Sequence, residues 1–147
     1  WDATRGGTYL VQWCDACAEP IHFPREVCPS CLSADSLSWR PSSGRGVVHA
    51  VSVQHRPAHP GMADRVPYAV ALIDLDAGSA NAGAGGAAAP SAGDGAVVRV
   101  ISNVVDVDPT TVQVGDPVSL TWEPMSDGRN LPQFVPADGA VGQGTAR

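Results

Sequence analysis

The segment that decides the fold is CDAC at residues 14–17, followed ten residues later by CPSC at residues 28–31. These two segments contain all four cysteines of the chain. Each Cys-x-x-Cys pair is typical of a tight turn that directs two thiolates towards one point. Zinc accepts four such sulfurs in tetrahedral geometry at about 2.3 Å. The spacing therefore predicts one structural zinc ion, bound by Cys14, Cys17, Cys28 and Cys31.

Three other uses of these cysteines stay open at this point. A secreted protein would form two disulfides, one pair alone could serve as a redox motif, and iron could replace zinc in a rubredoxin-like site. A catalytic zinc is disfavoured, because four thiolates leave no open coordination position. The segment is too small to offset its chain entropy by apolar burial, so its folding is expected to depend on the metal.

The residues around the cysteines predict a zinc ribbon over residues 1–42. Segments 9–13 and 36–40 carry β-forming or alternating residues and indicate two ribbon strands, with a short extended return at 20–24 between two prolines. A Gly-Gly pair near the N-terminus would end a preceding helix. Trp1 is then either a remnant of that helix or a core anchor.

Residues 43–136 predict a second domain, a five-stranded barrel of the OB type, with a β-sandwich as the alternative. The sequence therefore indicates an all-β protein. The turn signal VGDP at residues 114–117 separates the third strand from the fourth. The five expected strands cover residues 47–55, 68–75, 96–101, 118–122 and 132–135.

Two segments rich in alanine and glycine lack the residues needed for a core. Residues 77–95 are expected to form a flexible insertion between the second and third strands of the barrel, and residues 137–147 a disordered tail. Three tryptophans, Trp13, Trp39 and Trp122, are expected in the core.

The composition limits the classes of function. The chain of 147 residues has a formal charge of −6, with nine arginines and no lysine, which argues against a nucleic-acid-binding OB module. No apolar run approaches the roughly 20 residues that cross a bilayer. We therefore expect no membrane or nucleic-acid partner, and a cytoplasmic location.

One polar loop, residues 55–65, joins the first two barrel strands. Its Arg56, His59 and Arg65 are candidates for binding CoA phosphates or a protein partner, although a solvated loop is the plainer interpretation. Asp74 and Asp76 are expected to be solvated carboxylates at the end of a strand. No arrangement of a nucleophile with a base is visible, so no catalytic residue is predicted and an activity of the chain alone stays uncertain.

Several segments resemble one known family over residues 1–136, apart from the insertion. They include LVQWCDACAEPIHFPREVCPSC, SLSWRPSSGRGVVHAVSV, VPYAVALIDLD, VQVGDPVSLTWEP and LPQFVPA. The chain is thereby identified as a member of the rubredoxin-like zinc ribbon plus OB-fold family, first described as a domain of unknown function linked to acyl-CoA metabolism.

The resemblance implies a partner subunit. Members of this family bind thiolase-fold enzymes, and in actinobacterial sterol side-chain degradation such a domain accompanies a lipid-transfer-protein-like aldolase. That enzyme cleaves a β-hydroxyacyl-CoA by a retro-aldol step. The resemblance implies a noncatalytic subunit of this lyase complex, with acyl-CoA at a shared site. An acyl-CoA-binding scaffold for a thiolase or a hydratase is the alternative.

Overall fold

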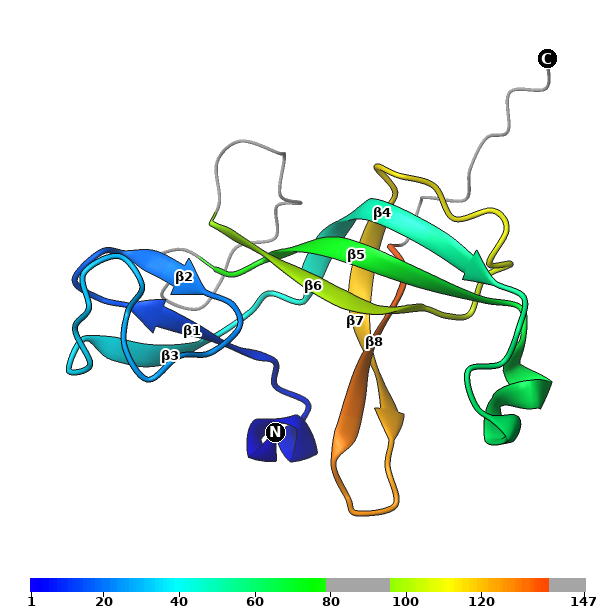
Figure 1. Cartoon of the computed structure of the whole chain (residues 1–147), viewed down its shortest axis with the longest axis horizontal. Helices are drawn as coiled ribbons and strands as arrows, with labels where there is room; N and C mark the ends of the chain where they lie inside the picture. The colour runs from blue at the N-terminus through cyan, green and yellow to red at the C-terminus, as the bar shows by residue number, and fades with distance from the viewer. Residues whose placement is uncertain (79–95, 138–147) are drawn as a thin grey trace.

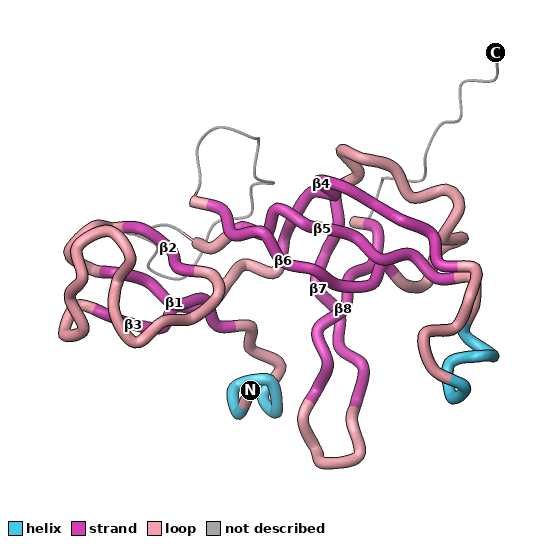
Figure 2. Tube along the Cα trace, viewed as in Figure 1, coloured by secondary structure: helices cyan, strands magenta, loops and turns pink. Residues whose placement is uncertain are grey.

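The chain forms two β-sheets, a three-stranded sheet followed by a closed five-stranded barrel (Figure 1). The computed structural model describes residues 1–78 and 96–137. Within these ranges every regular segment is a β-strand or a short 3-10 helix (Figure 2), which confirms the all-β class. Neither helical segment of the described ranges has the length and hydropathy needed to span a membrane.

The three-stranded sheet has β1 (Leu10–Cys14) at its centre, paired antiparallel with β2 (Glu19–Ile21) and β3 (Leu37–Pro41). A 3-10 helix, η1 (Asp2–Gly6), precedes it. Gly7 ends η1 with a φ of 68°, a left-handed conformation that glycine adopts without steric cost. The predicted stop at the Gly-Gly pair is therefore confirmed.

The barrel closes in the order β4-β5-β6-β8-β7, with β7 returning to β4. Its β6–β8 pair is parallel, whereas the other pairs are antiparallel. This closed arrangement confirms the OB barrel and excludes the sandwich. The strands are β4 (Arg45–Gln54), β5 (Tyr68–Asp76), β6 (Val97–Val104), β7 (Pro117–Pro124) and β8 (Asn130–Pro136).

The strand β8 is longer than the four residues that the sequence predicted. Its two prolines, Pro132 and Pro136, lower the β-strand propensity of this segment, because proline donates no hydrogen bond to a ladder. In the structure β8 pairs along its length with β7 but meets β6 at a single register position, Val104 with Phe134. A strand with one nearly free edge tolerates prolines.

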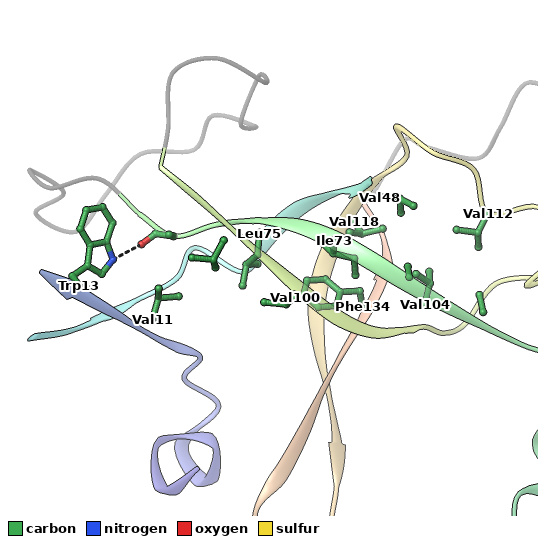
Figure 3. Close-up of a cluster of buried hydrophobic side chains, with 14 residues drawn as sticks. Val11, Trp13, Val48, Ile73, Leu75, Val100, Val104, Val112, Val118 and Phe134 are labelled. Carbon is green, nitrogen blue, oxygen red and sulfur yellow. Dashed lines mark hydrogen bonds between the residues drawn. The ribbon is translucent and has the colours of Figure 1, made fainter. Parts of the chain in front are cut away.

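The core of the barrel extends into the three-stranded sheet through Val11 and Trp13 of β1 (Figure 3). The Trp13 side chain is 1% exposed, and its indole Nε1 donates a hydrogen bond to the Ala77 carbonyl at 3.1 Å, drawn as the dashed line in Figure 3. Trp13 therefore joins the two sheets. The largest buried barrel side chains in the same cluster are Phe134, Ile73 and Leu75.

The prediction of a core position was wrong for Trp39, which is 53% exposed. Trp39 pairs with Gln12 across the β1–β3 ladder, so it shares a face with Gln12 and not with Trp13, whose face packs on the barrel. Trp122 is only partly buried. Trp1 is 68% exposed, so it is not a core anchor.

The predicted insertion begins too early by at least one residue. Ala77 is fully buried in the core, and its N–H donates to the Ala96 carbonyl at 2.9 Å, which continues the β5–β6 pairing. Ala77 also accepts the Trp13 hydrogen bond, a contact that composition does not reveal. The rest of the predicted insertion, residues 79–95, lies outside the described residues, as does the predicted tail beyond Ala137.

We expect Gly46→Ala to destabilise the barrel by about 1–3 kcal/mol, the usual cost of overpacking. A Cβ at Gly46 would lie 2.6 Å from Ile73 Cγ2 and 3.0 Å from the Asp74 carbonyl oxygen. Gly6→Ala is the matched control, because its Cβ would meet nothing within 4 Å. Urea unfolding of the two variants measures the difference, and equal stability would contradict the prediction.

Candidate functional site

The four cysteines meet at one end of the three-stranded sheet. Cys14 ends β1, Cys17 lies in the turn to β2, and Cys28 and Cys31 lie in the segment between β2 and β3. All four sulfurs lie within 4.8 Å of one another. The Cys14 and Cys31 sulfurs are 3.6 Å apart, and those of Cys17 and Cys28 are 3.9 Å apart.

These separations fit a four-coordinate metal. A tetrahedron of sulfurs with bonds of about 2.3 Å has edges of about 3.8 Å. All four cysteines are free thiols, with Cys14 and Cys28 buried, Cys17 partly buried and Cys31 exposed. The cluster can therefore hold a metal ion without moving the backbone, and it offers no open position for a substrate.

Each cysteine turn closes with a residue in the left-handed conformation. Ala18 follows Cys17 with a φ of 55°, and Leu32 follows Cys31 with a φ of 60°. Glycine is the usual residue for this conformation, so neither position could be recognised from its residue type.

The backbone of the second turn favours a thiolate at Cys28. The Ser30 N–H donates to the Cys28 sulfur at 3.4 Å. Backbone hydrogen bonds from Cys31 and Ser30 lower the pKa of the Cys28 thiol to about 7. The hydrogen bonds to the Cys31 and Cys14 thiols raise the pKa of Cys17, and burial acts in the same direction.

Two polar contacts, both missed in the sequence, attach the cysteine turns to the sheet. The Asp15 carboxylate accepts hydrogen bonds from Ser38 Oγ and Arg40 Nη2, each at 2.7 Å, and these two donors lower the pKa of Asp15. The Gln12 amide exchanges two hydrogen bonds of 2.8 Å with the Arg25 backbone. The first contact holds the Cys14–Cys17 turn on β3, and the second holds the following loop on β1.

The loop with Arg56, His59 and Arg65 lies between β4 and β5, where the sequence placed it, and contains the 3-10 helix η2 (Pro60–Arg65). His59 Nδ1 accepts the Gly61 N–H at 3.1 Å and so caps η2. Arg65 pairs with Glu123 of β7 at 2.7 Å, which raises the pKa of Arg65. Arg56 is exposed and has no polar partner among the described residues. Each of the three residues therefore has a different environment.

Asp74 and Asp76 are not simple solvated carboxylates, so this prediction was wrong. Asp74 accepts hydrogen bonds from Arg99 at 2.8 and 3.2 Å and lies 3.2 Å from His49 Nδ1. Asp76 accepts from Ser43 Oγ at 2.7 Å and from the Gly78 N–H at 2.8 Å. Asp74 faces Arg99 because β5 and β6 pair in that register, which the sequence alone does not reveal.

We expect Arg99→Ala to raise the pKa of Asp74 towards its ordinary value, because the Arg99 guanidinium holds that pKa down. The folded pKa lies below the unfolded value of about 3.9, so the pair stabilises the fold above that pH and loses its contribution as the pH falls through the folded pKa. At this exposure the effect is below about 1 kcal/mol. Carboxyl NMR titration measures the shift, and Arg56→Ala, which should leave it unchanged, is the control.

Two family models match the chain, one over the three-stranded sheet and one over the barrel. Residues 1–37 match the model for the rubredoxin-like zinc ribbon domain of ChsH2, and residues 39–123 match the model for the ChsH2 C-terminal OB-fold domain. The chain belongs to the ChsH2 zinc ribbon and OB-fold family. The resemblance seen in the sequence is therefore confirmed.

A solved structure described as an Ltp2-ChsH2(DUF35) aldolase contains a chain of the same fold. The match has a TM-score of 0.70 and 29% sequence identity, and it covers 92% of this chain and 89% of that one. The similarity thus extends over nearly the whole of both chains, including the ribbon and the barrel.

Three curated relatives carry names from acyl-CoA metabolism or scaffolding. A probable enoyl-CoA hydratase alpha subunit of Thermomonospora curvata is 31% identical over 93% of this chain. A DUF35 domain-containing scaffold protein of Methanothermobacter thermautotrophicus is 30% identical over 69%. A 3-oxo-4,17-pregnadiene-20-carboxyl-CoA hydratase alpha subunit of Mycobacterium tuberculosis is 31% identical over 58%. The matched regions span 36%, 62% and 21% of these relatives.

Proposed function

We propose that Cys14, Cys17, Cys28 and Cys31 bind one structural zinc ion. The proposal is supported by the sulfur separations of 3.6 and 3.9 Å and by membership of a zinc ribbon family. When bound, zinc would crosslink the two cysteine turns as four thiolates. A site that needs four reduced thiols suits the cytoplasm, which we propose as the location.

We further propose that the chain is a noncatalytic subunit of an aldolase. It binds a thiolase-fold enzyme and supports retro-aldol cleavage of a β-hydroxyacyl-CoA in sterol side-chain degradation. The observation that carries this proposal is the match over 92% of the chain to a chain of the Ltp2-ChsH2(DUF35) aldolase. The steroid name of the Mycobacterium tuberculosis relative supports the substrate class.

The polar side chains of the described residues support an accessory role. The four cysteines form the proposed zinc site, and His59 caps the 3-10 helix η2. The carboxylates of Asp74 and Glu123 pair with arginines on the outside of the barrel. These groups stabilise the fold through the thiol site, a helix cap and ion pairs. We therefore assign the acid–base chemistry of the cleavage to the partner subunit.

A second candidate function is a scaffold for a hydratase that acts on an enoyl-CoA. The names of two relatives, both hydratase alpha subunits, favour it. In that case the partner would add water to a double bond instead of breaking a carbon–carbon bond. The two functions share the family fold and differ in the partner enzyme.

Co-expression with a thiolase-fold, lipid-transfer-protein-like enzyme tests the first function. We expect a stoichiometric complex on size-exclusion chromatography, and cleavage of a β-hydroxyacyl-CoA by the complex but by neither subunit alone. The same chain with a hotdog-fold hydratase partner and an enoyl-CoA tests the second. If this chain forms no complex with a thiolase-fold enzyme, the aldolase proposal is wrong.

A further inference from the structure

A groove separates the three-stranded sheet from the barrel. Its volume is about 750 Å³, within the range of roughly 300–1,000 Å³ usual for small-molecule sites. Six segments form its walls: η1 with Trp1 before it, the start of β1 with the two residues before it, the residues after β2, β3, the middle of β6, and the start of β8. Figure 1 shows η1, marked N, below the three-stranded sheet and beside the lower ends of β7 and β8. We call it the junction groove, and its main apolar residues are Trp1, Leu10, Phe23, Trp39, Ile101 and Pro132.

The walls of the junction groove are unusually apolar for an open surface. Trp1, Phe23, Trp39 and Ile101 are 68%, 65%, 53% and 66% exposed, although each comes from a different segment. Burying such side chains is favourable by about 25 cal/mol per Å². A cluster of exposed apolar side chains around one cavity is typical of a binding site.

The charge of the groove selects against phosphate. Among the described residues no arginine lines it, and Asp2 is the only acidic residue on its wall. The Arg129 guanidinium lies over the Trp1 ring at 5.6 Å but is paired with Asp127, and the chain has no lysine. Burial lowers the pKa of His22, which favours the neutral form of this imidazole. The nucleotide part of CoA carries phosphates that need cationic or N–H donors, and this wall does not supply the cations. The preferred occupant is therefore a neutral, apolar group.

Three polar side chains of the wall are available to orient such a group. The Thr8 hydroxyl, the Tyr9 hydroxyl and the His22 ring make no side-chain hydrogen bond within the described residues and can donate to a carbonyl oxygen. Two polar side chains of β6 on the same wall are engaged. Ser102 donates to the Pro132 carbonyl at 2.9 Å, and Asn103 donates to the Ala69 carbonyl at 3.1 Å.

We propose that the junction groove binds the rigid, neutral polycyclic acyl group of the CoA thioester and leaves the CoA portion outside. This deepens the proposed function and depends on its substrate class. Flat aromatic walls suit flat rings, and a rigid ligand loses less conformational entropy on binding than a flexible acyl chain. The 3-oxo steroid in the name of one relative has this chemistry and a ketone that Thr8 or His22 could hold.

Titration of the full zinc-loaded chain with progesterone, a neutral 3-keto steroid, tests the proposal. We expect saturable one-to-one binding by calorimetry, with quenching of tryptophan fluorescence because Trp1 and Trp39 line the groove. CoA alone and palmitate should bind at least tenfold more weakly. Trp39→Ala and Ile101→Asp should each reduce progesterone affinity at least tenfold. Val114→Ala, which truncates an apolar side chain 67% exposed and outside the groove, should not.

Four results would overturn the inference: no saturable progesterone binding, equal or tighter binding of CoA or palmitate, affinity unchanged in both groove variants, or an equal loss in Val114→Ala. The titration is repeated on the complex with the thiolase-like partner. If Ile101→Asp abolishes the complex while progesterone never binds, the groove is a protein interface and the ligand proposal is wrong. If no complex forms, the proposed function fails, and binding by the chain alone still decides the inference.

Discussion

A chelator is expected to unfold the three-stranded sheet of the zinc-loaded protein while the barrel strands stay paired. Structural zinc contributes about 10–16 kcal/mol of apparent binding free energy to small metal-binding segments. The ribbon has only a minor core of its own, formed by Ile21 with Cys14 and Cys28. The metal therefore carries most of its stability. Elemental analysis should give one zinc per chain, and amide hydrogen exchange should show loss of protection in β1 and β3 on chelation.

Cys14→Ser should reproduce the effect of the chelator. Ser30→Ala is the matched control, because Ser30 lies inside the second cysteine turn and its hydroxyl bonds to Glu19 at 3.0 Å rather than lying among the four thiols. This variant should keep its zinc. If chelation leaves both the protection pattern and the melting temperature unchanged, the proposal of a structural zinc site is wrong.

Trp13→Ala is expected to destabilise the protein by about 3–5 kcal/mol, the usual cost of removing a fully buried aromatic side chain. The substitution opens a cavity in the core shared by the two sheets and leaves the Ala77 carbonyl without its indole donor. It also removes the ring on which the Arg40 guanidinium stacks at 4.6 Å. Urea unfolding followed by far-UV circular dichroism measures the loss of stability.

Trp39→Ala provides the control, since it deletes the same side chain at a position that is 53% exposed. We expect it to change stability by less than about 0.5 kcal/mol, as surface substitutions usually do. Hydrogen exchange in β5 should rise in Trp13→Ala only. Equal destabilisation by both variants would show that Trp13 does not join the two sheets in the way described here.

Local patterns in the sequence were sufficient for the cysteine cluster and for most strands. The Cys-x-x-Cys spacing needs only two tight turns to bring the thiols together, and the sulfurs do lie within 4.8 Å. The turn at residues 114–117 was also predictable, because Gly115 adopts a φ of 95° that glycine tolerates. The long β-forming runs that became β4 and β5 were clear for the same local reason.

Contacts between distant segments were not predictable. Asp74 and Arg99 are 25 positions apart and meet only because β5 and β6 pair in one register. Trp39 lies on the face of the three-stranded sheet opposite to Trp13, and neither its own hydrophobicity nor its strand partner Gln12, which is 5% exposed, predicts its exposure. The binding loop expected at residues 55–65 has its Arg65 in an ion pair with β7, a strand more than 50 residues later.

The sequence by itself determined the four-cysteine cluster, the all-β class and the family, because each depends on residues close together in the chain or on their order along it. Only the tertiary structure decided which tryptophan is buried, how β8 closes the barrel, and that η1, β3 and β6 enclose the junction groove. The reason is physical: burial and cavities arise where separate segments pack. A residue's own chemistry does not specify which distant segments will cover it.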